Sequence, residues 1–521
     1  MTSGETEQQS TRAEQTAAAA GRGVAFIAAA KAYFMVAGYV IYFRLPRLLK
    51  TAARWGNYLL VVRLTSFIDN CIVTGTIQGV SHFTAHGSHD ANAVKAAALR
   101  VQLFLGGLVA VAYFLFAPLI AQAERDPSLT PFYRLAAGIV CCYAFYAVFV
   151  GSLNGLRQFG RQATLDVVFA TLRAAMILGA AAAGLGVFGA IGGFVAAAFV
   201  ILCVSAIWVG LPGRSKTPFP AGQIWGYMPV LLVYNFFLNA MMNTDLFLLK
   251  RLVADLIAGS DQAAHALTAA EESSRWAGYY GTAQTLAFIP YQAILAVTFV
   301  IFPLISRSTF EKDSAATRRY VHQTLRLSLI FVASVATVLI ANPAAVIGVP
   351  YQVDYRIGAQ SLEILSAGMI CFSIFTIINT MLNGAGRKWQ AVALSFATFC
   401  VGAVANWWAI SSATSAEAAL ARAAWATTAS YGFGALLAGV ALFRSFSALF
   451  PLLTLLRVVV ACVVATLVGR FIPEVSRVVT LAECVGVMLV YYLVLVAIGE
   501  LRRSDIDKIL GVFLRRKKKG S

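Results

Sequence analysis

Charged side chains are scarce in this sequence. Only 12% of its 521 residues are Asp, Glu, Lys or Arg, and 59% are hydrophobic. A soluble protein carries about 25% charged residues, so the composition excludes a soluble globular enzyme. Because about 20 apolar residues cross a bilayer once, the sequence predicts an all-α polytopic membrane protein.

The sequence also lacks the common catalytic motifs. It has no GxxxxGK[ST] phosphate loop, no GxSxG nucleophile turn and no HExxH zinc helix. His82, His86 and His89 have the spacing of metal ligands, but Gly87 and Ser88 weaken a helix there and no cysteine completes a site. We interpret these histidines as part of a solvated loop. We therefore expect no enzyme, no metal site and no bound cofactor.

Basic residues outnumber acidic ones, 41 to 23, which gives a formal net charge of +18. No RNA-binding signature or zinc-finger spacing accompanies this excess, so we expect no nucleic-acid partner. The cytoplasmic loops of membrane proteins collect Lys and Arg. That tendency explains the charge without a nucleic acid.

Fourteen apolar runs predict membrane-spanning helices. They cover residues 24–43, 57–81, 99–121, 132–154, 163–183, 186–210, 226–248, 277–304, 321–341, 360–383, 389–411, 418–443, 449–471 and 478–499.

The two ends of the chain are polar or basic. Residues 1–23 show no apolar periodicity and no signal-peptide pattern, which predicts a disordered cytoplasmic tail before an uncleaved first helix. Residues 500–521 combine apolar positions with the run 515–519 of Arg and Lys. This pattern predicts an amphipathic cytoplasmic helix on anionic lipid. A plain basic stop signal is the alternative.

Loop charge predicts the orientation. An even number of helices with both termini inside leaves most loop Lys and Arg on the cytoplasmic side of the membrane. The first loop disagrees, because Arg44, Arg47, Lys50 and Arg54 fall on the outer side. Contact of this loop with substrate and contact with lipid head groups are both open.

A short motif occurs twice. Residues 153–155 read Leu-Asn-Gly, and so do residues 382–384, an offset of 229 residues. Each copy ends a predicted helix and precedes a Gly-Arg pair. We interpret the repeat as two parallel six-helix lobes, residues 24–210 and 226–443, with the helices of 449–499 appended. Repeated lobes with the substrate at their interface are a common transporter architecture.

Several ionisable residues lie inside the predicted helices. They are Lys31, Arg63, Asp69, Asp166, Arg173, Asp245, Glu363 and Glu483. Charges at membrane depth are costly and usually face a partner or a wet cavity. Since Lys31, Arg63 and Arg173 all belong to the first lobe, they predict a cationic cavity for an anionic substrate. Buried pairing of Arg63 with Asp69, or of Asp166 with Arg173, is the structural alternative.

The helix at 226–248 carries a polar stripe. Asn235, Asn239 and Asn243 recur every four residues and so share one helix face. A carboxamide offers both donors and an acceptor, which suits sugar hydroxyls. The stripe therefore predicts a cavity wall that binds sugars, with hydrogen bonding between helices as the alternative.

The region 235–310 resembles a known family. Residues 243–250 (NTDLFLLK), 277–284 (AGYYGTAQ) and 300–307 (VIFPLISR) are similar to motifs of the polysaccharide-transporter family. This family belongs to the multidrug/oligosaccharidyl-lipid/polysaccharide exporter superfamily, and the Leu-Asn-Gly repeats fit it too.

The resemblance implies a flippase for undecaprenyl-diphosphate-linked oligosaccharides that works by alternating access between two V-shaped lobes. Lys31, Arg63 and Arg173 would then bind the diphosphate, and the three asparagines the sugars. Proton or sodium coupling is suspected in the family, and Asp69, Asp166 and Asp245 are the candidates here. Membrane lipids and a polysaccharide polymerase are the implied partners.

Three other functions compete with this one. A cation-coupled multidrug exporter of the same superfamily would favour an acidic, aromatic cavity. A lipid II flippase would share the basic cavity predicted here. A membrane-embedded glycosyltransferase would need catalytic groups in a large loop, and residues 249–276 offer acids without metal-binding spacing.

Overall fold

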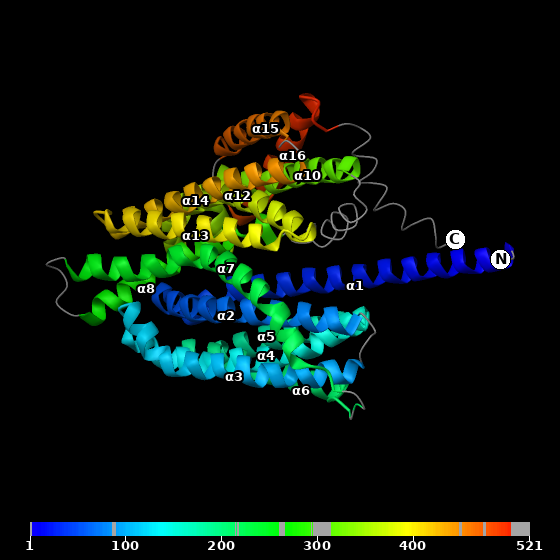
Figure 1. The fold of residues 1–521 in the computed structure, drawn as a ribbon. Coiled ribbons are helices and arrows are strands. Elements are labelled where there is room, and N and C mark those ends of the chain that lie inside the picture. The colour runs from blue at the N-terminus through cyan, green and yellow to red at the C-terminus, as the bar shows by residue number, and fades with distance from the viewer. Residues whose placement is uncertain are drawn as a thin grey trace. The chain divides into compact units, whose positions relative to one another are not determined.

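The computed structural model describes residues 3–501 apart from 86–89, 214, 216–217, 260–265, 293, 295–313, 448–450 and 473–475. The described residues form helices and no strands (Figure 1). They divide into two compact units. Unit 1 comprises Met1–Gly281 with Thr414–Ala416, and unit 2 comprises Thr282–Ala413 with Glu417–Ser521.

Unit 1 contains the first helices of the chain. They are α1 (Ser3–Leu49), α2 (Ala52–Ala85), α3 (Ala91–Ala123), the short η1 (Pro127–Leu129), α4 (Thr130–Gly155), α5 (Phe159–Ala182), α6 (Gly186–Val209), α7 (Ala221–Ala258) and most of α8 (Ala266–Ala287). Local chemistry sets several of these boundaries. Asp90 caps α3 through the amide of Asn92, and Pro127 opens η1 behind the capping Asp126.

Helix α4 is the centre of unit 1. It packs against α2, α3 and α6, while α1 packs along α5 and α7 packs along α2. Small residues let these helices approach. A Cβ on Gly151 of α4 would lie 2.9 Å from the Cβ of Val80, and one on Gly106 of α3 would lie 2.4 Å from that of Ala144. Close packing at small residues is how helices associate in lipid.

Unit 2 contains the remaining helices. They are α10 (Ser314–Ala341), α11 (Pro343–Gly348), η2 (Val353–Gly358), α12 (Ala359–Gly384), α13 (Lys388–Ser411), α14 (Ala416–Phe446), α15 (Leu452–Arg470) and α16 (Arg477–Ala497). Helix α10 packs against α12, α15 and α16. Glu500 links α10 to α15, because its buried carboxylate pairs with Arg326 of α10 at 2.7 Å and with Arg457 of α15 at 2.8 Å.

Thirteen helices of the described chain are long and apolar enough to cross a membrane. The chain is thus a multi-pass, all-helical membrane protein, as its composition predicts. Of the fourteen spans that the sequence predicts, the one at 277–304 has no counterpart among these thirteen. Most of its second half lies outside the described residues.

The internal repeat is visible in the helix boundaries. Helices α4 and α12 begin and end 229 residues apart, and so do α5 and α13. Each Leu-Asn-Gly motif ends a helix. Two residues later the chain takes a left-handed conformation, φ 57° at Arg157 and φ 78° at Gly386. The same sequence signal therefore makes the same helix–turn–helix in both halves. The lobe boundaries inferred from it stay a prediction.

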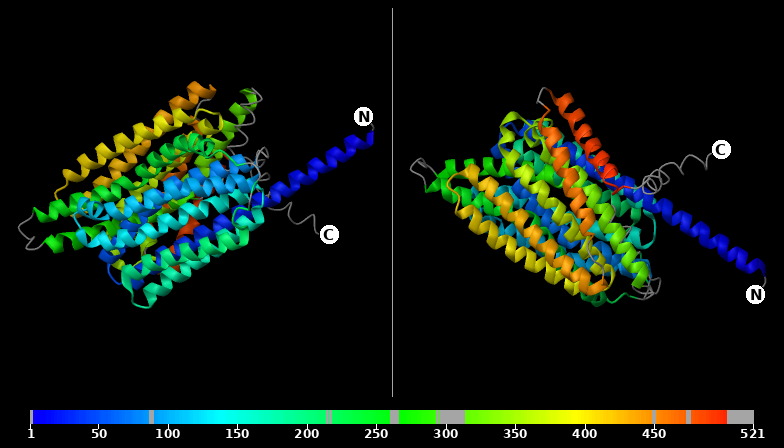
Figure 2. Two further views of the ribbon diagram at one scale, coloured as in Figure 1. Left: turned by 60° about the horizontal axis from the view of Figure 1, so that its bottom comes forward. Right: turned by 90° about the horizontal axis from the view of Figure 1, so that it is seen from above.

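The structure differs from two expectations about the N-terminal region. The basic loop expected between the first two helices is wrong, because α1 runs to Leu49 and α2 begins at Ala52. Arg44 and Arg47 belong to the last turns of α1 and Arg54 to the first turn of α2, so the charges lie on helix ends. Helix α1 also begins at Ser3, within the segment for which the sequence predicts a disordered tail, and its start extends beyond the other helices of unit 1 (Figure 2). The predicted amphipathic helix at the C-terminus lies outside the described residues.

Candidate functional site

Helices α1 and α5 bring two predicted cations together. Lys31 of α1 pairs with Asp166 of α5, with 2.9 Å between Nζ and Oδ2. One turn along α1, the ring of Phe34 lies under the guanidinium of Arg173 at 4.5 Å. A Cβ on Gly38 would be 3.4 Å from Nη2 of Arg173. Positions 31, 34 and 38 share one face of α1, and this face receives the charged side chains of α5.

The structure shows which cation pairs with Asp166. The sequence offered a pair of Asp166 with Arg173 on the same helix, but Asp166 pairs with Lys31 of the neighbouring helix instead. Arg173 lies between the rings of Phe34 and Phe194, at 4.5 and 5.6 Å. Cation–π stacking holds a guanidinium in place and leaves its edge available for hydrogen bonds.

Helix α2 adds Arg63 and Asp69 to the same neighbourhood. Arg63 lies close enough to Tyr39 of α1 for an electrostatic interaction with its hydroxyl. Asp69, Asp166 and Arg173 all interact in the same way with the hydroxyl of Tyr143 on α4. Asp69 is buried, and its Oδ1 accepts no hydrogen bond from the described residues. Three cations and two carboxylates thus gather around the aromatic faces of α1 and α4.

The asparagine stripe of α7 lies as predicted on one helix face, but its hydrogen bonds are mostly local. The amide groups of Asn235, Asn239 and Asn243 each donate to the carbonyl four residues earlier, at 2.8–2.9 Å. The oxygen of Asn239 accepts from Asn70 of α2 at 3.0 Å. The stripe therefore presents acceptor oxygens, and one of them joins α7 to α2.

Asp245 forms hydrogen bonds with two other residues of the motifs at 243–250 and 277–284. Its Oδ2 accepts from the hydroxyl of Tyr280 at 2.7 Å, and its Oδ1 accepts from the amide of Leu246 at 2.9 Å. Helix α8, which carries Tyr280, also crosses α2 closely. A Cβ on Gly278 would lie 2.4 Å from the carbonyl oxygen of Ala52. Only glycine allows that approach.

A buried polar cluster lies beyond the end of α3, and sequence reasoning missed it. Lys250 of α7 is fully buried and donates to Asp126 at 3.2 Å, to the carbonyl of Ala270 at 2.6 Å, and to the hydroxyls of Ser273 and Ser274 at 2.9 and 2.7 Å. The ammonium has three donors, and four acceptors surround them. The only sequence signal for this cluster was the lysine that ends the 243–250 motif.

Glu124 belongs to the same cluster. It follows the last turn of α3, is buried, and accepts from the hydroxyl of Tyr133 at 2.7 Å. The pKa of this carboxyl is raised to about 7: burial raises it most, the hydrogen bond from Tyr133 and the charge of Lys250 lower it, and the charge of Asp126 raises it. Its Oε2 has no hydrogen-bond partner among the described residues. Burial therefore favours the protonated form of Glu124.

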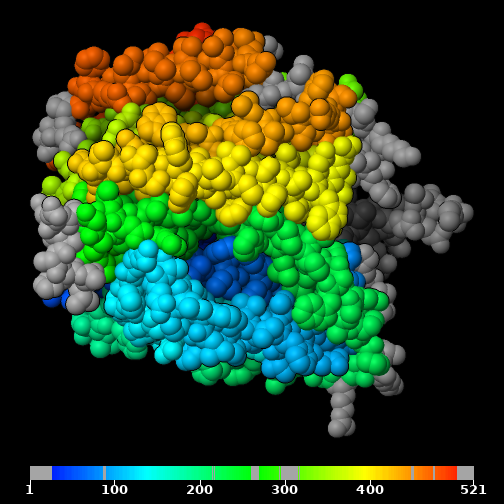
Figure 3. Space-filling model, turned by 60° about the vertical axis from the view of Figure 1, so that its left-hand side comes forward, coloured from blue at the N-terminus to red at the C-terminus, as the bar shows by residue number. Residues whose placement is uncertain are grey.

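The surface of unit 1 is hollowed. Figure 3 shows dark-blue residues of the first helices at the bottom of a hollow, between the cyan surface of α3 and the green surface of α7. Helix α7 is held along α2 by the rings of Phe67 and Phe236, 5.2 Å apart, and by the Asn70–Asn239 bond.

Metal ligands do not gather in the part of the chain that the structure describes, where no group of three or more His, Cys, Asp or Glu could hold an ion. His82 stacks on Tyr227 with the ring centroids 4.8 Å apart. His86 and His89 lie outside the described residues.

The arrangement of helices is similar to that of several solved structures. The structure is similar to a lipid II flippase, MurJ, in an inward closed conformation, with a TM-score of 0.67, 13% identity, and coverage of 88% of this chain and 97% of that one. It is also similar to an outward-facing multidrug resistance transporter of the MATE family (TM-score 0.62, 13% identity, 82% and 96% covered). A transporter from Pyrococcus furiosus, described as having a binding pocket of reverse polarity, gives 0.61 at the same identity and coverage. The protein thus has the fold of the MOP superfamily.

The sequence itself places the chain more narrowly. Residues 45–356 match the family model described as polysaccharide biosynthesis protein, and the chain belongs to that family. No curated protein matches it. The motif region of α7 and α8 lies within the matched residues. The roles of the individual site residues stay predictions.

Proposed function

We propose that this protein flips an oligosaccharide linked to undecaprenyl diphosphate from the cytoplasmic to the outer leaflet of a bacterial inner membrane. Membership of a polysaccharide biosynthesis family and a fold shared with a lipid II flippase support this proposal. The observation that carries it is the gathering of Lys31, Arg63 and Arg173 on neighbouring helices of unit 1. A transporter of this kind works by alternating access and delivers its product to a polymerase.

The diphosphate binds to these cations. Arginine presents a planar fork of donors that matches phosphate oxygens, and the stacked guanidinium of Arg173 is already oriented. The side chain of Lys31 is 48% exposed, whereas its partner Asp166 is 6% exposed. Lys31 can therefore turn from the carboxylate to a phosphate without carrying a buried charge through lipid.

The sugars bind along α7. Because the amide groups of Asn235 and Asn243 are engaged by backbone carbonyls, their oxygens are the groups that face a ligand. The oxygen of Asn243 is buried and accepts no hydrogen bond from the described residues. Sugar hydroxyls are donors that fit such acceptors.

Transport is coupled to a proton or a sodium ion at one of the predicted carboxylates. Asp69 is the strongest of the three, since it is buried and its Oδ1 accepts no hydrogen bond from the described residues. Asp166 is held by Lys31, and Asp245 is held by Tyr280 and a backbone amide. A carboxylate that lacks such partners gains most from binding a cation.

The test is deletion of the gene in its host, followed by complementation. We expect loss of one surface polymer and accumulation of its lipid-linked repeat unit, both reversed by the unaltered protein. The double variant R63Q/R173Q should fail to reverse them although it reaches the membrane. R161Q serves as a matched control, because Arg161 is exposed and donates to the nearby side chain of Gln158.

Other phenotypes would assign the protein elsewhere. Normal polymer with raised sensitivity to cationic drugs would assign it to multidrug export. Arrest of peptidoglycan synthesis would assign it to lipid II. Loss of a glycosyl bond from an otherwise flipped intermediate would assign it to a glycosyltransferase.

A further inference from the structure

The ends of α1 and α2 carry a group of cations that the proposed transport does not use. Arg44 and Arg47 lie in the last turns of α1, Lys50 lies in the turn that follows, and Arg54 lies in the first turn of α2. We call these four residues the basic turn. Three of them are exposed and Arg47 is half-buried. By the orientation that the sequence predicts, this end faces away from the cytoplasm, where basic residues are usually scarce.

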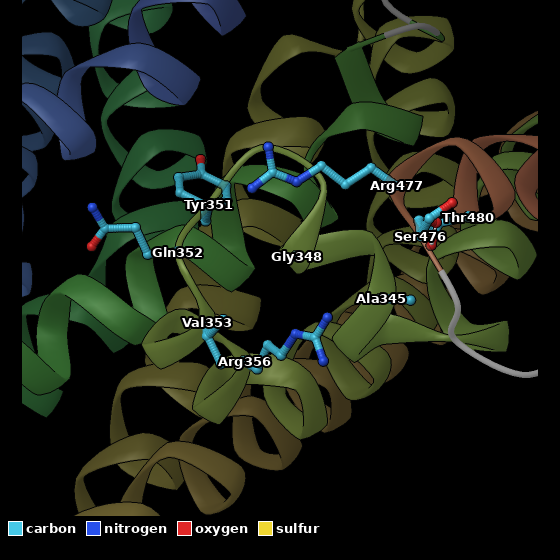
Figure 4. A pocket seen from close by; sticks show the side chains of 9 residues that line it. All are labelled: Ala345, Gly348, Tyr351, Gln352, Val353, Arg356, Ser476, Arg477 and Thr480. Atoms are coloured by element: carbon cyan, nitrogen blue, oxygen red, sulfur yellow. Dashed lines mark hydrogen bonds between the residues drawn. The ribbon is translucent and has the colours of Figure 1, made fainter.

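The basic turn has no acidic partner in the part of the chain that the structure describes. None of its four side chains forms an ion pair or a hydrogen bond there. Other cations are held differently. At the same end of unit 1, Arg125 pairs with Asp255 at 2.8 Å and Arg275 with Glu272 at 3.5 Å. Arg356, which lines a cavity of unit 2 (Figure 4), also interacts with another group of the chain. The basic turn therefore presents charge of one sign to its surroundings.

Lys50 has a backbone conformation that favours glycine. Its φ is 69°, in the left-handed region where a side chain is strained and glycine is not. The conformation belongs to a tight turn, since only Lys50 and Thr51 separate the two helices. The fold of this turn would accept glycine, so its ammonium group is a feature that folding does not require. Strain of this kind points to a function of the side chain.

An exposed apolar stripe on α1 leads to the basic turn. Its members, each between 43% and 61% exposed, are Phe26, Tyr33, Val36 and Val40. Because an α-helix turns about 100° per residue, these positions share one face with Arg44 and Arg47. A different face of α1, at positions 31, 34 and 38, receives the charged side chains of α5. A molecule on the stripe would therefore be separate from a substrate held by Lys31 and Arg173.

We propose that the basic turn binds the head group of an anionic phospholipid, whose acyl chain lies along the apolar stripe of α1. The apolar span of this helix, Phe26–Leu49, ends at the basic turn, which places these cations at the depth of lipid head groups. Basic residues at a membrane surface attract anionic head groups, and the planar fork of an arginine matches phosphate oxygens. The stripe favours a lipid over a soluble anion, and its distance around the helix from Lys31 favours a phospholipid over the transported lipid.

The test measures lipid binding to the purified full-length protein in detergent, with no transport involved. The probes are phosphatidylglycerol and phosphatidylethanolamine, added at equal concentrations and counted by native mass spectrometry. We expect phosphatidylglycerol to bind more tightly, because the head group of phosphatidylethanolamine has no net charge. Each of R44Q, R47Q and R54Q should weaken phosphatidylglycerol binding about fivefold, as for the loss of one basic residue at a membrane surface.

Lys50→Gly separates binding from folding. It removes one charge of the basic turn and relieves a left-handed side chain, so phosphatidylglycerol binding should fall about fivefold without a fall in the unfolding temperature. Arg157→Gly is the matched control, because Arg157 is also an exposed cation with a positive φ, 57°. It follows α4 at the opposite end of unit 1, where a Cβ on Gly155 would lie 2.5 Å from that of Thr84 near the end of α2. Its lipid binding should equal that of the unaltered protein.

Three results would overturn the proposal. The first is phosphatidylglycerol binding that is unchanged in R44Q/R47Q, and loss of polymer synthesis in that same variant would then assign the cations to the transported lipid. The second is equal weakening in Arg157→Gly, because any surface cation would then do. The third is equal binding of the two lipids by the unaltered protein, which would show that the head-group charge is not recognised.

Discussion

Tyr280 donates a hydrogen bond to the buried carboxylate of Asp245, with 2.7 Å between its hydroxyl oxygen and Oδ2. The two residues come from neighbouring helices, α7 and α8, and both stand in the motifs that place this chain in its family. The bond therefore joins the motif at 243–250 to the motif at 277–284.

Removing the hydroxyl of Tyr280 should therefore destabilise unit 1. Tyr280→Phe leaves one oxygen of a buried carboxylate without its partner, which costs about 1–3 kcal/mol. Thermal unfolding of the purified protein in detergent measures the effect. Tyr33→Phe is the control, because the hydroxyl of Tyr33 bonds to Thr171 at an exposed position. Equal losses in the two variants would contradict the prediction.

The crossing of α2 and α8 predicts a second effect. Gly278→Ala brings a Cβ to 2.4 Å from the carbonyl oxygen of Ala52, so the helices must separate. Overpacking of this kind costs about 1–3 kcal/mol. Gly107→Ala makes the same change in α3 with nothing within 4 Å and should be neutral or slightly stabilising. A stable Gly278→Ala protein would mean that this crossing is loose.

Lys250 should be far more important to stability than an exposed cation. Lys250→Met removes the ammonium that Asp126 faces in a buried site and should cost about 3–5 kcal/mol. Arg125→Met breaks the pair with Asp255, whose side chains are 54% and 41% exposed, and should cost at most about 1 kcal/mol. Denaturant unfolding compares the two. Asp126→Asn added to Lys250→Met should recover part of the loss, because the side chain that faced the ammonium is then neutral.

Glu124 predicts a pH dependence of stability. Its pKa is raised by burial from 4.5 to about 7 in the folded protein, so the folded state holds the proton more tightly than the unfolded one. The stabilisation is complete below about pH 4.5 and is lost as the pH rises through about 7. The unfolding temperature of the unaltered protein should fall across this range.

Glu124→Gln should flatten that fall, since its amide stays neutral. Glu272→Gln should leave it unchanged, because Glu272 is exposed beside Arg275. An unfolding temperature that rises between pH 5 and 7 and is insensitive to Glu124→Gln would show that the carboxyl is ionised in the folded protein.

Exchanging the charges at positions 31 and 166 separates the structural role of Lys31 from its role in transport. In the double variant K31D/D166K the ion pair can form again, so the unfolding temperature lost in K31D should largely return. Transport should not return, because the cation then stands at position 166, where the native side chain is 6% exposed, instead of at position 31, which is 48% exposed. Polymer synthesis in the deletion strain reports transport. Full recovery of polymer would make Lys31 a purely structural partner.

Much of the fold could be read from the chain. Apolar runs about 20 residues long predicted almost every helix, because lipid requires each crossing segment to satisfy its own backbone. Helix ends were less predictable. Arg44, Arg47 and Arg54 were assigned to a loop because charge usually ends a span, yet the helices continue through them, since long side chains reach water from a helix end.

The candidate site was only partly predictable. Depth in the bilayer identified Lys31, Asp166 and Arg173 as unusual, but spacing along α5 suggested the wrong partner for Asp166. Asn70 was not singled out by any pattern, and it is the residue that pairs with Asn239. Partner choice depends on which helix packs alongside, and that is a long-range property.

The sequence by itself determined that this protein is a helical membrane body with an internal repeat of 229 residues, because hydropathy and turn signals act locally. The tertiary structure alone decided where its charges meet. Lys250 and Asp126 are 124 residues apart in the chain, and only the packing of α7 beside the end of α3 gives a buried ammonium its acceptors. Desolvation makes such a cluster costly unless every contact forms, so its energetics belong to the assembled bundle.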